Sequence, residues 1–175
     1  MDLIERARDT LQSHANAALA TVSPDGRPWN SPVYVAFDGD LTFYWSSHND
    51  AEHSKNIAAN ANVLLVVFDS AEPDKSGRAA YIRARARELS KETDIQRAVE
   101  RLAKRKRQTP RPPTDFMGEH RRRMYEAAPD MVWANVVKEE GGHYFDERVP
   151  IDVQRISQGL PSVHLNGRRD DSSYE

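Results

Sequence analysis

Side chains that can bind an anion are concentrated in residues 44–56, where an apolar run gives way to a polar one. Ser46 and Ser47 end the apolar run, and Ser54 and Lys55 follow shortly after. Hydroxyls donate hydrogen bonds to phosphate oxygens, and a lysine adds a full positive charge. A helix beginning near residue 50 would point its unpaired N–H groups to the same place. The segment predicts a phosphomonoester site, although serines at such junctions also serve as helix caps.

The runs on either side are those of a β-rich domain. A short N-terminal helix is indicated by Leu3, Ala7 and Leu11, which recur at helical spacing. Apolar or alternating runs predict about six or seven strands, at residues 17–22, 29–37, 41–46, 63–68, 80–89, 131–137 and 143–149. Turn residues separate several of them, at 23–26, 38–39 and 139–142. Pro32 within the second run predicts an edge strand or a bulge. Short strands joined by tight turns favour a barrel or a sandwich.

Two further helices are expected after the fifth strand. Ser90 is expected to cap a helix whose apolar stripe is Ile95, Ala98, Val99 and Leu102. Three prolines in residues 108–114 must end that helix, and this segment would be a connector or a lid. A second helical piece is predicted at residues 116–127, and residues 70–77 read as a loop.

Composition sets the broad class. The chain has 175 residues, a net charge of −2, 38% hydrophobic residues and no cysteine. These values predict one globular domain over residues 1–165 and a disordered tail over 166–175. They exclude disulfides and thiolate chemistry, and no apolar run reaches the roughly 18 residues of a membrane span. The N-terminus lacks the pattern of a signal peptide, so a cytoplasmic location is expected.

Residues 17–69 resemble the FMN-binding split barrels of the pyridoxamine 5′-phosphate oxidase superfamily. The resemblance rests on an ordered series of segments, at residues 18–22, 25–28, 31–33, 38–44, 46–47, 53–57 and 60–63. It extends more loosely to Val149. It implies a mainly β (α+β) fold, a six- or seven-stranded antiparallel split β-barrel with peripheral helices. It also implies a flavin-dependent oxidoreductase that holds FMN between the two subunits of a homodimer and acts on a small molecule.

By position, the resemblance implies a set of cofactor-binding residues. The second strand would line the isoalloxazine ring and ribityl chain, the serines and lysine would hold the ribityl and phosphate oxygens, and two residues would come from the partner subunit. These residues are Asn30, Ser31, Pro32, Val33, Ser46, Ser47, Ser54, Lys55, Trp133 and Arg148.

The sequence departs from the family where pyridoxamine phosphate is recognised. An Arg-x-His pair expected late in the chain is not found in residues 142–148, and Asn30 stands where relatives tend to have arginine. A different small-molecule substrate is therefore expected. No catalytic acid or base is assigned, since His143 and Tyr144 are as readily structural or exposed.

Several alternatives stay open. A relative on the same barrel could bind a deazaflavin or haem instead, or carry flavin without turnover. Residues 101–123 hold nine Lys or Arg against two acids, a run that could bind nucleic acid or simply be a solvated helix end. His48 and His53, with Asp50 and Glu52 between them, could suggest a metal. Their spacing places the two histidines on different helical faces, so no metal site is expected.

Overall fold

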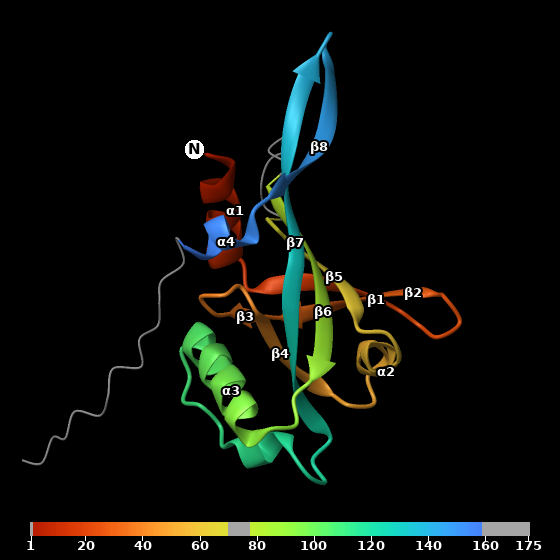
Figure 1. The fold of residues 1–175 in the computed structure, drawn as a ribbon, viewed down its shortest axis with the longest axis vertical. Coiled ribbons are helices and arrows are strands. Elements are labelled where there is room, and N and C mark those ends of the chain that lie inside the picture. Colours follow the sequence, from red (N-terminus) through yellow and green to blue (C-terminus); the bar gives the residue numbers. More distant parts are fainter. Residues whose placement is uncertain (1, 70–77, 159–175) are drawn as a thin grey trace, which may run out of the picture.

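The computed structural model describes residues 2–69 and 78–158, which form an eight-stranded antiparallel sheet with helices around it (Figure 1). The strands are β1 (Asn16–Val22), β2 (Pro28–Tyr34), β3 (Ala36–Phe37), β4 (Phe43–His48), β5 (Asn62–Phe68), β6 (Ala79–Glu88), β7 (Arg122–Glu140) and β8 (His143–Ile151). The helices are α1 (Leu3–Ser13), α2 (Glu52–Ala59), α3 (Glu92–Lys106), α4 (Val153–Ser157) and the 3-10 turn η1 (Pro113–Phe116).

The sheet closes on itself because its two end strands are neighbours in the chain. Its order is β2-β1-β5-β6-β7-β4-β3, with β8 paired to β7. Only Val35 separates β2 from β3, so the first and last strands of this order are held together by the backbone. The predicted fold class, a mainly antiparallel split barrel with peripheral helices, is confirmed. The eighth strand arises because the run predicted at residues 29–37 is divided at Val35.

Strand alternation places one set of side chains inside the barrel. Residues such as Leu19, Leu65 and Ile82 are fully buried there, and α1 and α2 add apolar side chains to the same core. A second apolar cluster lies on the outside of the sheet, between α3 and strands β3, β4 and β7. Its members include Ala36, Tyr44, Met124 and the α3 residues Ile95, Ala98, Val99 and Leu102. The predicted apolar stripe of α3 is confirmed.

The helix predicted at residues 116–127 is wrong. Only Pro113–Phe116 is helical, as a single 3-10 turn, and β7 begins at Arg122. Met124 faces α3 while Tyr125 and Ala127 face the barrel core, an alternation with a period of two. Pairing with β4 on one side and β6 on the other decides the conformation. Pro129 fits in this strand because the register shifts there, between Arg83 and Ala84 of β6.

Smaller expectations are also corrected. Lys91, and not Ser90, is the N-cap of α3, and no side chain caps this helix. β4 continues to His48, so Ser46 and Ser47 lie within the strand and not beyond its end. Pro32 does lie on an edge strand, since β2 pairs only with β1. The predicted loop at 70–77 and the tail at 166–175 lie outside the described residues.

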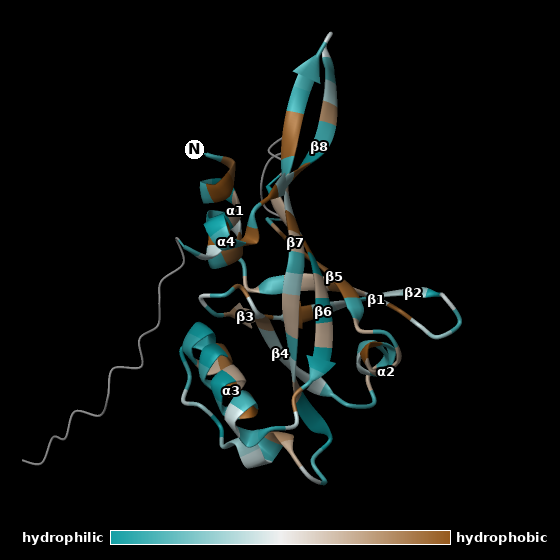
Figure 2. Ribbon diagram, viewed as in Figure 1, coloured by the Kyte–Doolittle hydropathy of each residue, from teal (hydrophilic) through white to brown (hydrophobic). Residues whose placement is uncertain are grey.

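β7 and β8 continue as a two-stranded ribbon that projects beyond the barrel (Figure 1). Both glycines of its turn, Gly141 and Gly142, have positive φ, as the predicted hairpin signal requires. Figure 2 shows apolar stretches on the projecting part, and Tyr144 and Phe145 are about half exposed there. Within the described residues, no helix has the length and apolar character needed to cross a bilayer.

We predict that Leu19→Ala lowers the free energy of unfolding by about 2–5 kcal/mol, because Leu19 is fully buried on a strand bonded on both sides. Urea denaturation followed by circular dichroism measures the change. Val22→Ala, on the same strand but 39% exposed, is the matched control and should change the value by less than about 0.5 kcal/mol. Equal losses in the two variants would contradict the barrel core described above.

Candidate functional site

Four of the predicted cofactor residues lie on one side of the sheet, the side turned away from the barrel core. Cross-strand pairing aligns Pro32, Ala18, Val66, Tyr81, Trp133 and Pro150 in one row. Residues directly opposite one another on neighbouring strands point to the same side of a sheet. A second row contains Asn30, Ala20, Leu64, Arg83 and Met131. Arg148 joins the same side, since it pairs with Asn135, two residues after Trp133. We call this surface the outer face.

The middle of the outer face, on β1 and β5, is apolar and partly accessible. Ala18, Ala20, Leu64 and Val66 are all intermediate in exposure, whereas their inward-facing neighbour Leu19 is fully buried. The helix α3 covers the outer side of β3, β4 and part of β7, but it does not reach these residues of β1 and β5 (Figure 1). The β1 and β5 part of the outer face is therefore an apolar surface of the kind that packs against another molecule.

Two guanidinium groups lie over aromatic rings on the outer face. The Cζ atom of Arg148 is 4.5 Å from the centre of the Tyr81 ring, and that of Arg83 is 5.8 Å from the Trp133 ring. Arg83 also pairs with Asp130 at 2.7 Å. For Arg148 the described residues supply no acidic partner. This charge is thus held in place by a ring and is still able to meet an anion.

At the β2 edge, the outer face deepens into a pocket of about 470 Å³. Asn30 and Pro32 form one wall, residues 13–18 form another, and the half-exposed Phe68 also lines it. Its volume lies within the range of small-molecule sites. Two residues predicted from the second strand thus line a cavity, next to an apolar surface.

The other two second-strand residues point the opposite way. Val33 is 7% exposed and belongs to the barrel core. The Ser31 hydroxyl accepts a hydrogen bond from Trp29 Nε1 at 3.0 Å and lies 3.1 Å from Nδ1 of His53. Alternation along β2 therefore separates Asn30 and Pro32 from Ser31 and Val33, which sequence position alone had grouped together.

Alternation also separates the two serines of β4. Ser46 lies on the α3 side, 3.4 Å from Nη1 of Arg122, in a small pocket that Lys106 and Arg111 also line. Ser47 points to the opposite side of the strand. The two hydroxyls therefore do not converge on one anion.

The α2 residues are likewise divided. Ser54 is buried, and its hydroxyl donates a 2.7 Å hydrogen bond to the backbone carbonyl of His48, which ties the helix to the end of β4. Lys55 is exposed, and the described residues offer its ammonium group no hydrogen bond or ion pair. Of the predicted anion-binding residues of this helix, Lys55 is the one whose charge is available.

From the sequence, His53 was considered only as a metal ligand and was assigned no other role. It is 8% exposed, its Nδ1 faces Ser31, and its Nε2 has no partner among the described residues. Burial lowers the pKa of His53, so the imidazole is neutral near pH 7. The sequence did contain a signal for this burial, because the spacing of His53, Asn56 and Ile57 places them on one helical face. All three side chains are buried in the structure.

No metal centre emerges from this arrangement. Asp50 lies 4.0 Å from His48 and also pairs with Arg121, while His53 points into the molecule. In the part of the chain that the structure describes, no three His, Asp or Glu side chains are grouped closely enough to hold a metal ion.

The basic run at residues 101–123 is partly neutralised within the fold. Arg111 pairs with Asp115, Arg121 with Asp50, and Arg123 with Glu88. Arg105 is half-buried and donates to backbone carbonyls of the α1 end. The run therefore does not form the continuous stripe of free cations expected of a nucleic-acid surface.

A family model described as pyridoxamine 5′-phosphate oxidase matches residues 3–136, more than three quarters of the chain and nearly all of the barrel. The chain belongs to the pyridoxamine 5′-phosphate oxidase family. No curated protein matches the sequence.

Solved structures similar to this family member have different described roles. A candidate pyridoxamine 5′-phosphate oxidase from Listeria innocua is 20% identical, with a TM-score of 0.56 over 76% of this chain and 98% of that one. The haem storage protein HutZ from Vibrio cholerae is 14% identical, with a TM-score of 0.62 over 77% and 95%. The protein Atu2129 from Agrobacterium tumefaciens, of unknown function, is 20% identical with a TM-score of 0.59. The match covers 81% of this chain but 57% of Atu2129. At these identities the comparisons establish the fold alone.

We predict that stability falls as the pH drops below about 6.5, the ordinary pKa of histidine. Because the folded-state pKa of His53 is lowered, the unfolded chain binds the extra proton more readily, so acid favours unfolding. The loss should level off once the pH is below the folded-state pKa. Urea denaturation across this pH range measures it.

A His53→Gln variant should show a shallower fall in stability over the same pH range. His143→Gln, at an exposed position, is the control and should retain the wild-type slope. An unchanged slope in His53→Gln would contradict a buried neutral imidazole.

Proposed function

We propose that this protein is an FMN-dependent oxidoreductase, acting as a homodimer that holds the flavin between the outer faces of two subunits. The observation that supports this most is that Asn30 and Pro32 of β2, Trp133 of β7 and Arg148 of β8 all lie on the same uncovered side of the sheet. They are also the positions that the family resemblance implies for the cofactor. Membership of a family named after an oxidase supports the same activity.

The outer face suits a flavin ring system. Pro32 and the aromatic rings of Tyr81 and Trp133 offer flat apolar contacts, and the Asn30 amide can both donate and accept hydrogen bonds at the ring edge. Bound FMN would supply the hydride chemistry, while the protein supplies position and electrostatics. Arg148, already fixed over a ring, would place positive charge beside the bound group.

The three serines and the lysine expected to hold the phosphate cannot all bind it together. Ser54 already donates its proton to a carbonyl, and Ser46 and Ser47 point to opposite sides of β4. Of the residues predicted to hold the phosphate, Lys55 is the charged one, and its ammonium group has no partner in the described part of the chain. We infer that Lys55 supplies the main charge for the phosphate, with Ser46 or Ser47 contributing at most one hydroxyl.

Dimerisation follows from the same surface. An apolar face of several strands is costly to leave in water, and a second copy would cover it. Each flavin would then contact Asn30 and Pro32 of one subunit and Trp133 and Arg148 of the partner subunit. Residues on the central strands β5 and β6 would form the middle of the interface.

The direct test is to purify the protein, record its visible spectrum and identify any released cofactor by mass. FMN with an oxidised-flavin spectrum supports the proposal. A haem or deazaflavin spectrum would instead support a different cofactor on the same barrel. Similar solved structures include the haem storage protein HutZ and, with a TM-score of 0.53, an F420 reductase. Flavin that no reductant turns over would instead indicate a carrier. Colourless protein that binds nucleic acid only at low salt would support the basic run as the functional site.

We predict that Lys55→Ala weakens FMN binding by about 1.5–3 kcal/mol, the usual value of a hydrogen bond to a charged group. Titration of the apo-protein with FMN, followed by flavin fluorescence, measures the affinity. Lys91→Ala removes another exposed lysine, at the start of α3, and should leave the affinity unchanged. Identical affinities for all three proteins would remove Lys55 from the site.

We also predict that Leu64→Asp converts the dimer into a monomer, because it places a charge at the middle of the outer face. Analytical ultracentrifugation gives the mass, and circular dichroism checks the fold. Glu139→Lys, which changes a charge near the tip of the projecting ribbon, is the control and should remain dimeric. A wild-type protein that is monomeric at every concentration would rule out the shared site.

A further inference from the structure

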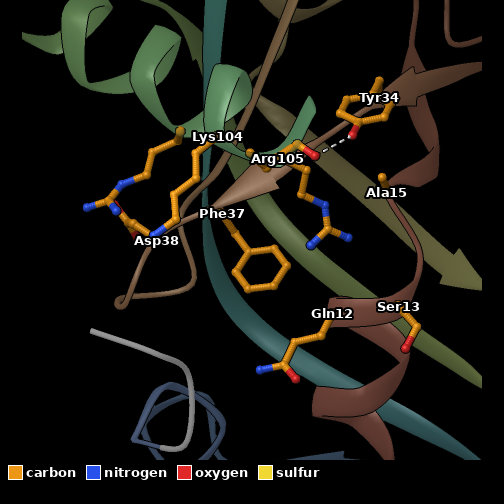
Figure 3. A pocket seen from close by; sticks show the side chains of 10 residues that line it. Gln12, Ser13, Ala15, Tyr34, Phe37, Asp38, Lys104 and Arg105 are labelled. Atoms are coloured by element: carbon orange, nitrogen blue, oxygen red, sulfur yellow. Dashed lines mark hydrogen bonds between the residues drawn. The ribbon is translucent and has the colours of Figure 1, made fainter. Parts of the chain in front are cut away.

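A second cavity lies under the last turns of α3, apart from the outer face. It has a volume of about 560 Å³ and lies between the end of α1, the β2–β3 segment and α3 (Figure 3). Gln12 and Ser13 come from α1, and Tyr34, Phe37 and Asp38 from the strands and the turn after them. None of the ten residues predicted to bind the cofactor lines this cavity.

Three cations of α3 point to the cavity. Arg101, Lys104 and Arg105 are spaced so that they share one helical face. The side chains of Arg101 and Lys104 make no hydrogen bond or ion pair within the described residues. Lysines and arginines at a helix end are favourable in themselves, so the charges alone would not define a site. Here, however, all three also line a cavity, although Lys104 is exposed to solvent as well.

Arg105 is held in a fixed position. Its Nη2 donates to the carbonyls of Leu11 and His14, at 2.9 and 2.7 Å, and its Cζ lies 5.4 Å from the centre of the Phe37 ring. The Tyr34 hydroxyl in turn donates to the Arg105 carbonyl at 3.2 Å. A guanidinium has five N–H donors, and both carbonyls accept from the same nitrogen of Arg105, Nη2. The remaining donors can bind a ligand.

The cavity contains one carboxylate, and its oxygens are already bonded. Asp38 Oδ1 accepts hydrogen bonds from the N–H groups of Asp40 and Thr42, both at 3.1 Å. Its Oδ2 accepts from the Tyr44 hydroxyl at 2.7 Å. Asp38 therefore stabilises the turn before β4, and the three cations leave the cavity with a net positive charge.

The floor of the cavity is apolar. Figure 3 shows the Phe37 ring between the α3 cations and the α1 side chains Gln12 and Ser13. Ala15 and Ala36 extend this surface. A ligand that fits would combine an anionic group near Arg101 and Lys104 with a flat apolar body against Phe37.

The helix directions favour a single negative charge over a double one. Both α1 and α3 end at the cavity, so both point their carbonyl ends, which carry partial negative charge, towards it. Only the Ser13 hydroxyl and the Gln12 amide add neutral side-chain donors to those of the cations and tyrosine. A phosphate dianion prefers helix N-termini and several N–H donors. Guanidinium groups bind carboxylates and phosphates alike, so the two helix ends, and not the arginines, favour the carboxylate.

We propose that this cavity is a binding site for small aromatic carboxylates. The proposal does not depend on flavin binding, because the cavity and the predicted cofactor residues are separate. Ser13 and Ala15 border both this cavity and the outer-face pocket, so a ligand here would lie next to the proposed cofactor site.

The test is fluorescence titration of the purified protein with 2-naphthoate, 2-naphthylmethanol and 2-naphthyl phosphate. We expect 2-naphthoate to bind at least about tenfold more tightly than either analogue. Equal binding of the neutral alcohol would overturn the role of charge, and tighter binding of the phosphate would overturn the carboxylate assignment.

Variants locate the site. Arg101→Gln combined with Lys104→Gln should weaken 2-naphthoate binding by about tenfold or more. Gln12→Glu, which adds a negative charge on the opposite wall at an exposed position, should weaken it independently. Lys91→Gln combined with Arg107→Gln removes the same charge from the two ends of α3 outside the cavity and should not. Equal loss in the control, or no loss in the cavity variants, would overturn the proposal. The binding of FMN, measured on the same variants, should stay unchanged.

Discussion

Along each strand of the closed sheet, successive side chains point alternately into the barrel and out of it, and the rest of the structure depends on this alternation. Because β2 and β3 are joined through Val35 at opposite ends of the strand order, the sheet must curl, and every strand acquires an inside and an outside. The inside is filled by the core. The outside of β1 and β5 stays apolar without a helix over it. The residues that the proposed function requires lie on the same side of the sheet, on the strands β2, β7 and β8.

The helix α3 divides the outer side of the barrel into two regions with different chemistry. Where it packs, on β3, β4 and β7, the apolar residues are covered, and its cations border the cavity beneath its last turns. Where it does not reach, the surface is open and carries rings with guanidinium groups above them. A flat cofactor suits the open region, whereas a smaller anion with an apolar body suits the cavity.

Local patterns were sufficient to predict most of the strands, because their alternation follows directly from burial on one side. They failed at residues 116–127, whose composition is helix-like, because backbone pairing of β7 with β4 on one side and β6 on the other makes most of this segment a strand. The site was predicted as a set of sequence positions, so Ser31 and Val33 were grouped with Asn30 and Pro32 although adjacent residues point to opposite sides. The buried state of His53 depends on how α2 packs on β2, which no local pattern specifies.

The central claim is that one uncovered sheet face binds the flavin and the second subunit together. A crystal structure of the protein grown with saturating FMN tests this most directly. We predict isoalloxazine density against Pro32 of one subunit and Trp133 of the partner subunit, with the phosphate within reach of Lys55. FMN density elsewhere on the molecule, or an outer face covered by a second copy with no flavin between them, would contradict it.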